Sequence, residues 1–428
     1  MKTGSVMFIF LLGSLTALAQ TEDLPKTVAG FPVNYDEKSI PAYTLPDLLL
    51  LKNGGIVNDS TTWKEKRRPE LLKEIEEIQF GKMPPPPSDI SFKIVDEGKT
   101  AFEGKAIRKQ VTIYFTEDTT DHKMDLLLYI PAEATGPVPL FFNVSFVANS
   151  QVADDPEVKV GKIWNREGQK ILADQPGRFP KINIEQFVEA GFGFATVYYG
   201  DIEPDFKDGI EYGIRSLYLE NGQSKLKPDE WGTISAWAWG LSRAMDYFEK
   251  DTAIDATRVA IHGVSRLGKT VLWTGAKDTR FKMVIASCSG EGGAALARRD
   301  YGENIKHLSD TSRYSYQFAA NYNSSSDHVD DLPYDAHSIV ALMAPRPLLL
   351  QTGNSDYWSD PKGELLAANE AKAVYELFGE SGPSTIKMPA AGDTSLLFNK
   401  LGYFMHEGGH GTVPSDFPIF ISYMKKYL

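Results

Sequence analysis

The stretch RVAIHGVSRLGK, residues 258–269, decides the fold of this 428-residue chain. It begins as an apolar run with the composition of a buried strand. It then passes through Gly263-Val264-Ser265 and continues without a break into a helical pattern that ends near Lys277. A sharp turn from strand to helix lifts the serine above the sheet, and small neighbouring residues relieve the crowding there. The stretch therefore predicts a nucleophile elbow at Ser265.

Strands and helices alternate on both sides of this turn. Further apolar strand segments lie at residues 139–146, 192–200, 283–290 and 347–353, and a long helical pattern covers 231–249. Continuous apolar strands separated by helices indicate a parallel sheet that helices cover on both faces. Segments of strand composition between residues 90 and 130 predict an antiparallel edge before it. Together with the elbow, this organisation predicts an α/β-hydrolase fold, a three-layer sandwich with a mostly parallel central sheet.

The N-terminus carries a predicted secretory signal peptide, residues 1–19. Lys2 precedes an apolar run that ends in Ala17-Leu18-Ala19, a small-residue cleavage site. The run is shorter than the roughly 20 apolar residues that span a bilayer, which argues against a membrane anchor. Residues 20–87 are expected to form an N-terminal wrap and a proline-rich spacer, and residues 88–428 the catalytic domain. We therefore expect a secreted or periplasmic protein.

The net charge restricts the classes of molecule that the protein can bind, and the cysteine content determines whether disulfide bonds can stabilise its fold. The chain has 45 Lys and Arg against 57 Asp and Glu, a formal net charge of -12. An acidic surface argues against nucleic acid and anionic membranes as partners, because both require basic patches. Cys288 is the single cysteine, so the chain has no intramolecular disulfide. Its apolar surroundings favour a buried small hydrophobe over a reactive thiol.

Ser265 is the candidate nucleophile. The helix that follows it points backbone N–H groups at any oxyanion that develops beside the serine. The second glycine is Gly268, one place later than in the common Gly-x-Ser-x-Gly pattern, and Arg266 follows the serine directly. Serine also caps helices for structural reasons. The strand before it, the helix after it and the flanking glycines together favour the catalytic interpretation.

A serine nucleophile needs a base, which the α/β-hydrolase fold supplies late in the chain. Of the seven histidines, only His406 and His410 follow the last predicted core strand. Both lie in residues 404–411, which read as a glycine-rich loop before the terminal helix. His410 is preferred because it lies between glycines, where a loop can present it to Ser265. His262 lies on the strand of the elbow itself and reads as a packed core residue.

The base in turn needs an orienting carboxylate. Asp356 is the first carboxylate after the strand at residues 347–353, where this fold normally carries its acid. Asp360, before Pro361, reads as a turn residue. Glu291, just past the strand that follows the elbow helix, is the competing candidate.

These residues resemble carbohydrate esterase family 15, the glucuronoyl esterases. The resemblance rests on the elbow at residues 263–269, SGEGGAA at 289–295, APRP at 344–347, DYWSDP at 356–361 and the late His410. It implies that Ser265 attacks an ester carbonyl and His410 relays the proton, while Arg266 assists the oxyanion with its side chain and backbone N–H. It also implies a pocket for a uronic-acid ring, lined by Lys269, Glu303 and Trp358.

The implied substrate is an ester of glucuronic acid, or its 4-O-methyl form, on xylan with an alcohol of lignin. No metal or organic cofactor is implied. Counting from the serine, the position of the catalytic glutamate in fungal members is occupied here by Cys288, whereas many bacterial members use an acid at the place of Asp356. The nearest alternative is an acetylxylan esterase. A non-catalytic carbohydrate-binding relative or a peptidase agrees less well with the motifs.

Overall fold

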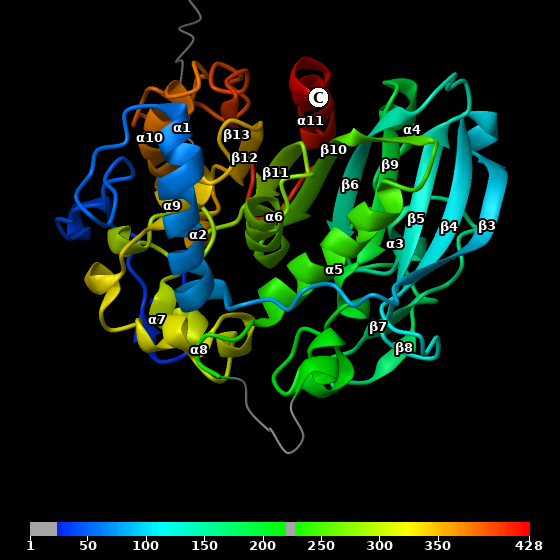
Figure 1. Ribbon diagram of the computed structural model, residues 1–428, viewed down its shortest axis with the longest axis horizontal. Helices are drawn as coiled ribbons and strands as arrows, with labels where there is room; N and C mark the ends of the chain where they lie inside the picture. The colour runs from blue at the N-terminus through cyan, green and yellow to red at the C-terminus, as the bar shows by residue number, and fades with distance from the viewer. Residues whose placement is uncertain (1–23, 220–226) are drawn as a thin grey trace, which may run out of the picture.

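The computed structural model describes residues 24–219 and 227–428 (Figure 1). The predicted signal peptide at residues 1–19 lies outside the described residues. The core is a nine-stranded sheet with the order β13-β12-β11-β10-β6-β9-β5-β4-β3. Its strands are β3 (Ser91–Ala101), β4 (Ala106–Tyr114), β5 (Lys123–Pro131), β6 (Val138–Ser145), β9 (Gly193–Tyr198), β10 (Ile254–Val264), β11 (Met283–Ser287), β12 (Leu348–Gly353) and β13 (Leu401–His406).

The pairing of the strands confirms a mostly parallel sheet with an antiparallel edge. The strands from β13 to β9 in the sheet order pair in parallel. Strands β5, β4 and β3 continue the sheet as an antiparallel meander. Two short hairpins lie apart from this sheet, β1 (Thr27–Val28) with β2 (Phe31–Pro32) and β7 (Lys162–Trp164) with β8 (Lys170–Leu172).

Helices cover both faces of the sheet, as predicted. In Figure 1, α5 and α6 cross in front of the strands, and α11 lies behind them. Each face buries its own hydrophobic cluster, one around Trp237 and Trp273 and the other around Phe141 and Phe420. The helices are α1 (Ser60–Thr62), α2 (Arg68–Ile75), α3 (Asn149–Val152), α4 (Glu185–Glu189), α5 (Thr233–Phe248), α6 (Arg266–Lys277), α7 (Ile305–Ser309), α8 (Ala320–Ser324), α9 (Ala336–Ala341), α10 (Pro361–Glu376) and α11 (Asp416–Tyr427).

The segment before residue 88 packs against the helical layer. Arg68 of α2 donates one hydrogen bond to the carbonyl of Leu342, just after α9, and another to the carbonyl of Ala276, within α6. Trp63 and Phe80 are fully buried in the same cluster as Trp273. The division of the chain at residue 87 stays a prediction, because one continuous core contains residues from both sides of it.

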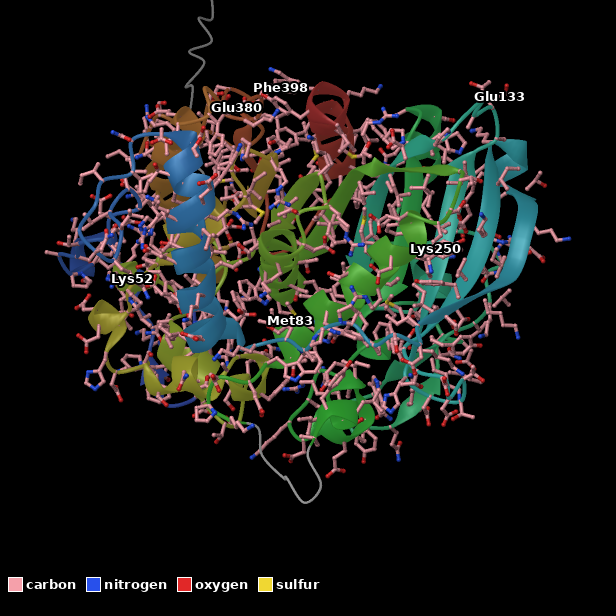
Figure 2. All side chains as sticks on the ribbon, in the orientation of Figure 1. Lys52, Met83, Glu133, Lys250, Glu380 and Phe398 are labelled. Atoms are coloured by element: carbon pink, nitrogen blue, oxygen red, sulfur yellow. The ribbon has the colours of Figure 1, made fainter. Side chains whose placement is uncertain are left out.

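Some charged side chains lie at the periphery of the molecule, whereas others, including Lys269 and Glu291, are buried. Glu133 is exposed at the edge of the molecule (Figure 2), and Glu380 is half-buried. Within the described residues, no helix combines the length and apolar character needed to cross a bilayer.

Candidate active site

The elbow at Ser265 has the backbone geometry that the sequence predicts. β10 ends at Val264 and α6 begins at Arg266, so Ser265 alone makes the turn, with φ 60° and ψ -126°. A positive φ is costly for a residue with a side chain and persists where the surrounding structure imposes it. The turn leaves Ser265 partly exposed in a cleft of about 230 Å³.

Two glycines permit this turn by leaving space for neighbouring backbone. A Cβ atom on Gly263 would lie 2.4 Å from the carbonyl oxygen of Leu267. A Cβ atom on Gly268 would lie 2.8 Å from the carbonyl oxygen of Ser287, at the end of β11. The second glycine therefore stands where α6 crosses β11, which explains its place one residue later than in the common pattern.

His410 and Asp356 meet at the same cleft. Asp356 lies just beyond the end of β12 and is buried, and its Oδ2 is 2.7 Å from Nδ1 of His410. His410 is 42% exposed, so its ring reaches the solvent side of the cleft that also contains Ser265. The Ser359 hydroxyl lies 3.0 Å from the same Nδ1 atom, a contact that the sequence did not suggest. This arrangement allows the carboxylate to hold the ring by one nitrogen and leave the other free.

The structure separates the two candidate acids. Glu291 is buried, and its Oε1 accepts a hydrogen bond of 2.9 Å from the Tyr322 hydroxyl, which lies on α8. Burial raises the pKa of the Glu291 carboxyl well above its usual value. The cleft of Ser265 is lined by Asp356 and not by Glu291. Of the two, the carboxylate of Asp356 is therefore the one in contact with His410.

Cys288 follows β11 and is buried, as expected from its apolar surroundings. Its thiol nevertheless lines the cleft, between the backbone N–H and carbonyl of Gly411, each 3.4 Å away. Burial and the nearby charge of Asp356 raise the pKa of the thiol well above its usual value. The resemblance assigns Cys288 the position of the catalytic glutamate in fungal members, and its thiol lies within 4.8 Å of ligand atoms of Asp356 and His410.

Arg266 is fixed by a carboxylate that sequence reasoning missed. Its Nη1 atom makes a very short contact with Oδ2 of Asp205, in the loop that follows β9. The same carboxylate accepts hydrogen bonds from the Tyr316 hydroxyl at 2.9 Å and from Gln317 Nε2 at 2.7 Å. The guanidinium also lies 4.5 Å from the ring centroid of Tyr314. These contacts hold a positive charge beside the serine.

Lys269, Glu303 and Trp358 lie together on the wall of the cleft. Lys269 Nζ is 4.0 Å from Glu303 Oε2, and the Glu303 backbone N–H donates to the carbonyl of Trp358. Burial lowers the pKa of the Lys269 ammonium, against the opposing charge of Glu303. Arg313 joins this group, with Nη2 3.0 Å from Glu303 Oε1 and its guanidinium 5.3 Å from the Trp358 ring centroid.

The segment at residues 299–337 contributes Glu303, Arg313 and Gln317 to the cleft. The N-terminal segment supports this wall from outside. The Asn34 carbonyl accepts a hydrogen bond from the Gly302 backbone N–H, and its side-chain amide donates to the Asp300 carbonyl. Such contacts join residues far apart in the chain, so no local sequence pattern predicts them.

His406 is not in a loop, contrary to the prediction for residues 404–411. It is the last residue of β13, which pairs in parallel with β12. The ring is buried, with Nδ1 2.8 Å from Asp416 Oδ2 and Nε2 3.2 Å from the Gly409 carbonyl. His406 therefore anchors the start of the loop that carries His410.

The anchor at His406 predicts a pH-dependent stability. Burial disfavours the charged imidazole, but Asp416 outweighs this effect and raises the pKa of His406. The resulting stabilisation is complete below the usual histidine pKa of about 6.5 and is lost as pH rises through the higher folded-state pKa. His406→Gln should lower the free energy of unfolding by about 1–3 kcal/mol at pH 5.5 and by less at pH 9.

Urea unfolding at both pH values measures this difference. His328→Gln is the matched control, because His328 is 71% exposed. An equal loss of stability at pH 5.5 and pH 9 would show that the charge on His406 contributes nothing.

The chain is similar to known carbohydrate esterases. A sequence model of the family described as fungal glucuronyl esterase matches residues 225–379. The prokaryotic carbohydrate esterase MZ0003 is 39% identical, over 99% of this chain and 98% of its own. A 4-O-methyl-glucuronoyl methylesterase of Wolfiporia cocos is 25% identical, over 89% of this chain and 83% of its own.

A solved glucuronoyl esterase structure from Solibacter usitatus superposes with a TM-score of 0.86 and 42% identity, covering 91% of this chain and 99% of that one. The likeness thus extends from the elbow to nearly the whole described fold. The chain belongs to the glucuronoyl esterases, carbohydrate esterase family 15.

Proposed function

We propose that this protein hydrolyses esters of glucuronic acid, including its 4-O-methyl form, through an acyl-enzyme on Ser265. The observation that carries the proposal is the contact of 2.7 Å between Asp356 and His410, in the same cleft as the strained Ser265. A serine, a free imidazole nitrogen and an orienting carboxylate are the parts that acyl transfer requires.

The reaction follows from the roles of these groups. His410 takes the proton of the Ser265 hydroxyl as the oxygen attacks the ester carbonyl, and it later returns that proton to the leaving alcohol. Asp356 keeps the proton on Nδ1 and stabilises the imidazolium that forms. Water then repeats the sequence on the acyl-enzyme and releases the uronic acid.

Arg266 stabilises the oxyanion in both half-reactions. Its backbone N–H is the first of α6, and its guanidinium is held in place by Asp205 and Tyr314. Because Asp205 fixes the charge before the substrate arrives, little reorganisation is needed when negative charge develops on the carbonyl oxygen.

The sugar ring is bound by Lys269, Glu303 and Trp358. An ammonium and a carboxylate can hydrogen-bond to sugar hydroxyls, and the tryptophan face offers an apolar surface to the ring. Arg313 holds both Glu303 and Trp358, so it positions this pocket. A polar pocket of this kind suits a uronate better than it suits a small acetyl group.

Specificity constants on three substrates test the proposal. We expect benzyl or methyl glucuronate to be hydrolysed with a kcat/KM far above those for 4-nitrophenyl acetate and acetylated xylan. The reverse ranking would make the protein an acetylxylan esterase, because the same serine chemistry acts on acetate esters.

Trp358→Ala should mainly raise the KM for benzyl glucuronate, by about tenfold, with a much smaller change in kcat. The ring of the sugar does not react, so contact with it stabilises the ground and transition states alike. Tyr357→Ala is the matched control, because Tyr357 is the adjacent aromatic residue but is exposed and does not line the cleft. A loss confined to kcat would place Trp358 in transition-state stabilisation instead.

In its biological setting, the substrate is an ester between glucuronoxylan and an alcohol of lignin. Export agrees with this polymer substrate and with the N-terminal sequence at residues 1–19. Mass spectrometry of the protein recovered outside the cytoplasm tests export, with Gln20 or its pyroglutamate form expected as the first residue.

A further inference from the structure

Three side chains of different chemistry converge in the cleft. The Cys288 sulphur, a carboxylate oxygen of Asp356 and a ring nitrogen of His410 all lie within 4.8 Å of one another. All three residues line the cleft that opens at Ser265. The sulphur is kept there by the backbone of Gly411, which contacts it through both its N–H and its carbonyl group.

Thiolate, imidazole and carboxylate are together a ligand set for zinc and chemically related ions. Metal–ligand bonds of about 2.0–2.3 Å place the ligand atoms of a tetrahedral site roughly 3.3–3.8 Å apart. The three atoms lie within 4.8 Å of one another, so shifts of about an ångström reach that spacing, including a widening of the 2.7 Å contact between Asp356 and His410 where Nδ1 is the ligand. Water from the open cleft can supply a fourth ligand. Mg²⁺ and Ca²⁺ prefer sets made of oxygen atoms.

We propose that Cys288, Asp356 and His410 form an inhibitory site for Zn²⁺ and Cd²⁺. Binding exchanges the thiol proton for the ion, and that proton leaves to solvent. Where the ion bonds to Nδ1, the ring proton moves to Nε2 and the imidazole stays neutral. The catalytic cycle needs both nitrogens of His410, one for Asp356 and one for Ser265. An ion on either nitrogen therefore stops ester hydrolysis, which makes it an inhibitor and not a cofactor.

Cys288 is what adds a metal site to this active centre. A serine hydrolase needs the acid and the base, whereas the thiol has no step in the proposed reaction. Cys288 is also the single cysteine of the chain, so any metal–thiolate signal comes from this position.

Binding is measured first, without any substrate, on the full mature chain freed of metal by EDTA and dialysis. Cd²⁺ should produce an ultraviolet thiolate-to-metal charge-transfer band that saturates at one ion per chain. Ser265→Ala should bind Cd²⁺ with the same affinity, because it keeps all three ligands. Cys288→Ala should lose the band, and Cys288→Ser, checked for folding by circular dichroism, should lose it as well.

Inhibition is measured next, with benzyl glucuronate and with each variant compared to its own metal-free rate. Micromolar Zn²⁺ should remove at least about 90% of the wild-type rate, and EDTA should restore it. Cys288→Ala should need at least about tenfold more Zn²⁺ for the same inhibition. Mg²⁺ should have no effect, and His328→Ala, which removes an exposed histidine, should be inhibited like the wild type.

The inhibition arm rests on the proposed function, whereas the binding arm does not, so the two can fail separately. A charge-transfer band with no turnover of glucuronate esters would reject the proposed substrate and keep the metal site. Absence of the band, or equal Zn²⁺ inhibition of the wild type and Cys288→Ala, would overturn the metal site.

Discussion

Ser265→Ala is expected to lower kcat for benzyl glucuronate by about 10⁴- to 10⁶-fold, because the nucleophile, base and acid act as a unit. The fold should survive, since alanine removes only the hydroxyl and meets the same positive φ as the serine it replaces. We therefore expect a melting temperature within a few degrees of the wild type. Release of glucuronic acid gives the rate, and mass spectrometry of the quenched enzyme detects the acyl adduct on the wild type alone.

The control serine lies in the same cleft. The Ser359 hydroxyl is 3.0 Å from Nδ1 of His410, so it contacts the base. Ser359 does not lie at the elbow, which places Ser265 and not Ser359 for attack on the substrate. Ser359→Ala should cost less than about tenfold in kcat. Turnover near the wild-type level in a clean Ser265→Ala preparation would refute the serine mechanism and, with it, the assignment of every other role.

Local patterns were sufficient to predict the layers of the fold and the elbow. The strand, turn and helix at residues 258–277 are contiguous, so sequence periodicity and the flanking glycines identify them directly. β13 escaped prediction because its residues Leu401–His406 run into the glycines at 408, 409 and 411, which read as a loop. Its strand conformation is stabilised by pairing with β12, some fifty residues earlier in the chain.

The parts of the site that sequence did not reveal depend on contacts between distant segments. Asp205 holds Arg266 across 61 positions, and Asn34 supports the Asp300–Gly302 turn from the N-terminal segment. No spacing rule connects such residues. Cys288 was rightly expected to be buried, but its position beside His410 follows from the path of the loop between β13 and α11, which contains Gly411.

The choice between Asp356 and Glu291 illustrates how geometry adds to sequence. Both lie shortly after a parallel strand, and the sequence favours Asp356 because it follows the strand from which this fold normally supplies its acid. In the fold, Asp356 faces Nδ1 of His410, whereas Glu291 faces the Tyr322 hydroxyl. Because burial raises the pKa of Glu291, its carboxyl is held toward the neutral form, which cannot stabilise an imidazolium.

Asp356→Asn should therefore reduce kcat for benzyl glucuronate by up to about 10⁴-fold, because an amide favours the wrong tautomer of His410 and leaves the imidazolium without its counter-charge. Glu291→Gln keeps the shape of the side chain and an oxygen that can accept the hydrogen bond of Tyr322, and Glu291 does not contact His410, so its kcat should stay within about tenfold of the wild type. Steady-state kinetics on both variants at one pH decide the matter. A severe loss of kcat in Glu291→Gln beside a mild loss in Asp356→Asn would transfer the acid role to Glu291. Comparable moderate losses would mean that both carboxyls support His410, Asp356 by direct contact and Glu291 through the intervening loop.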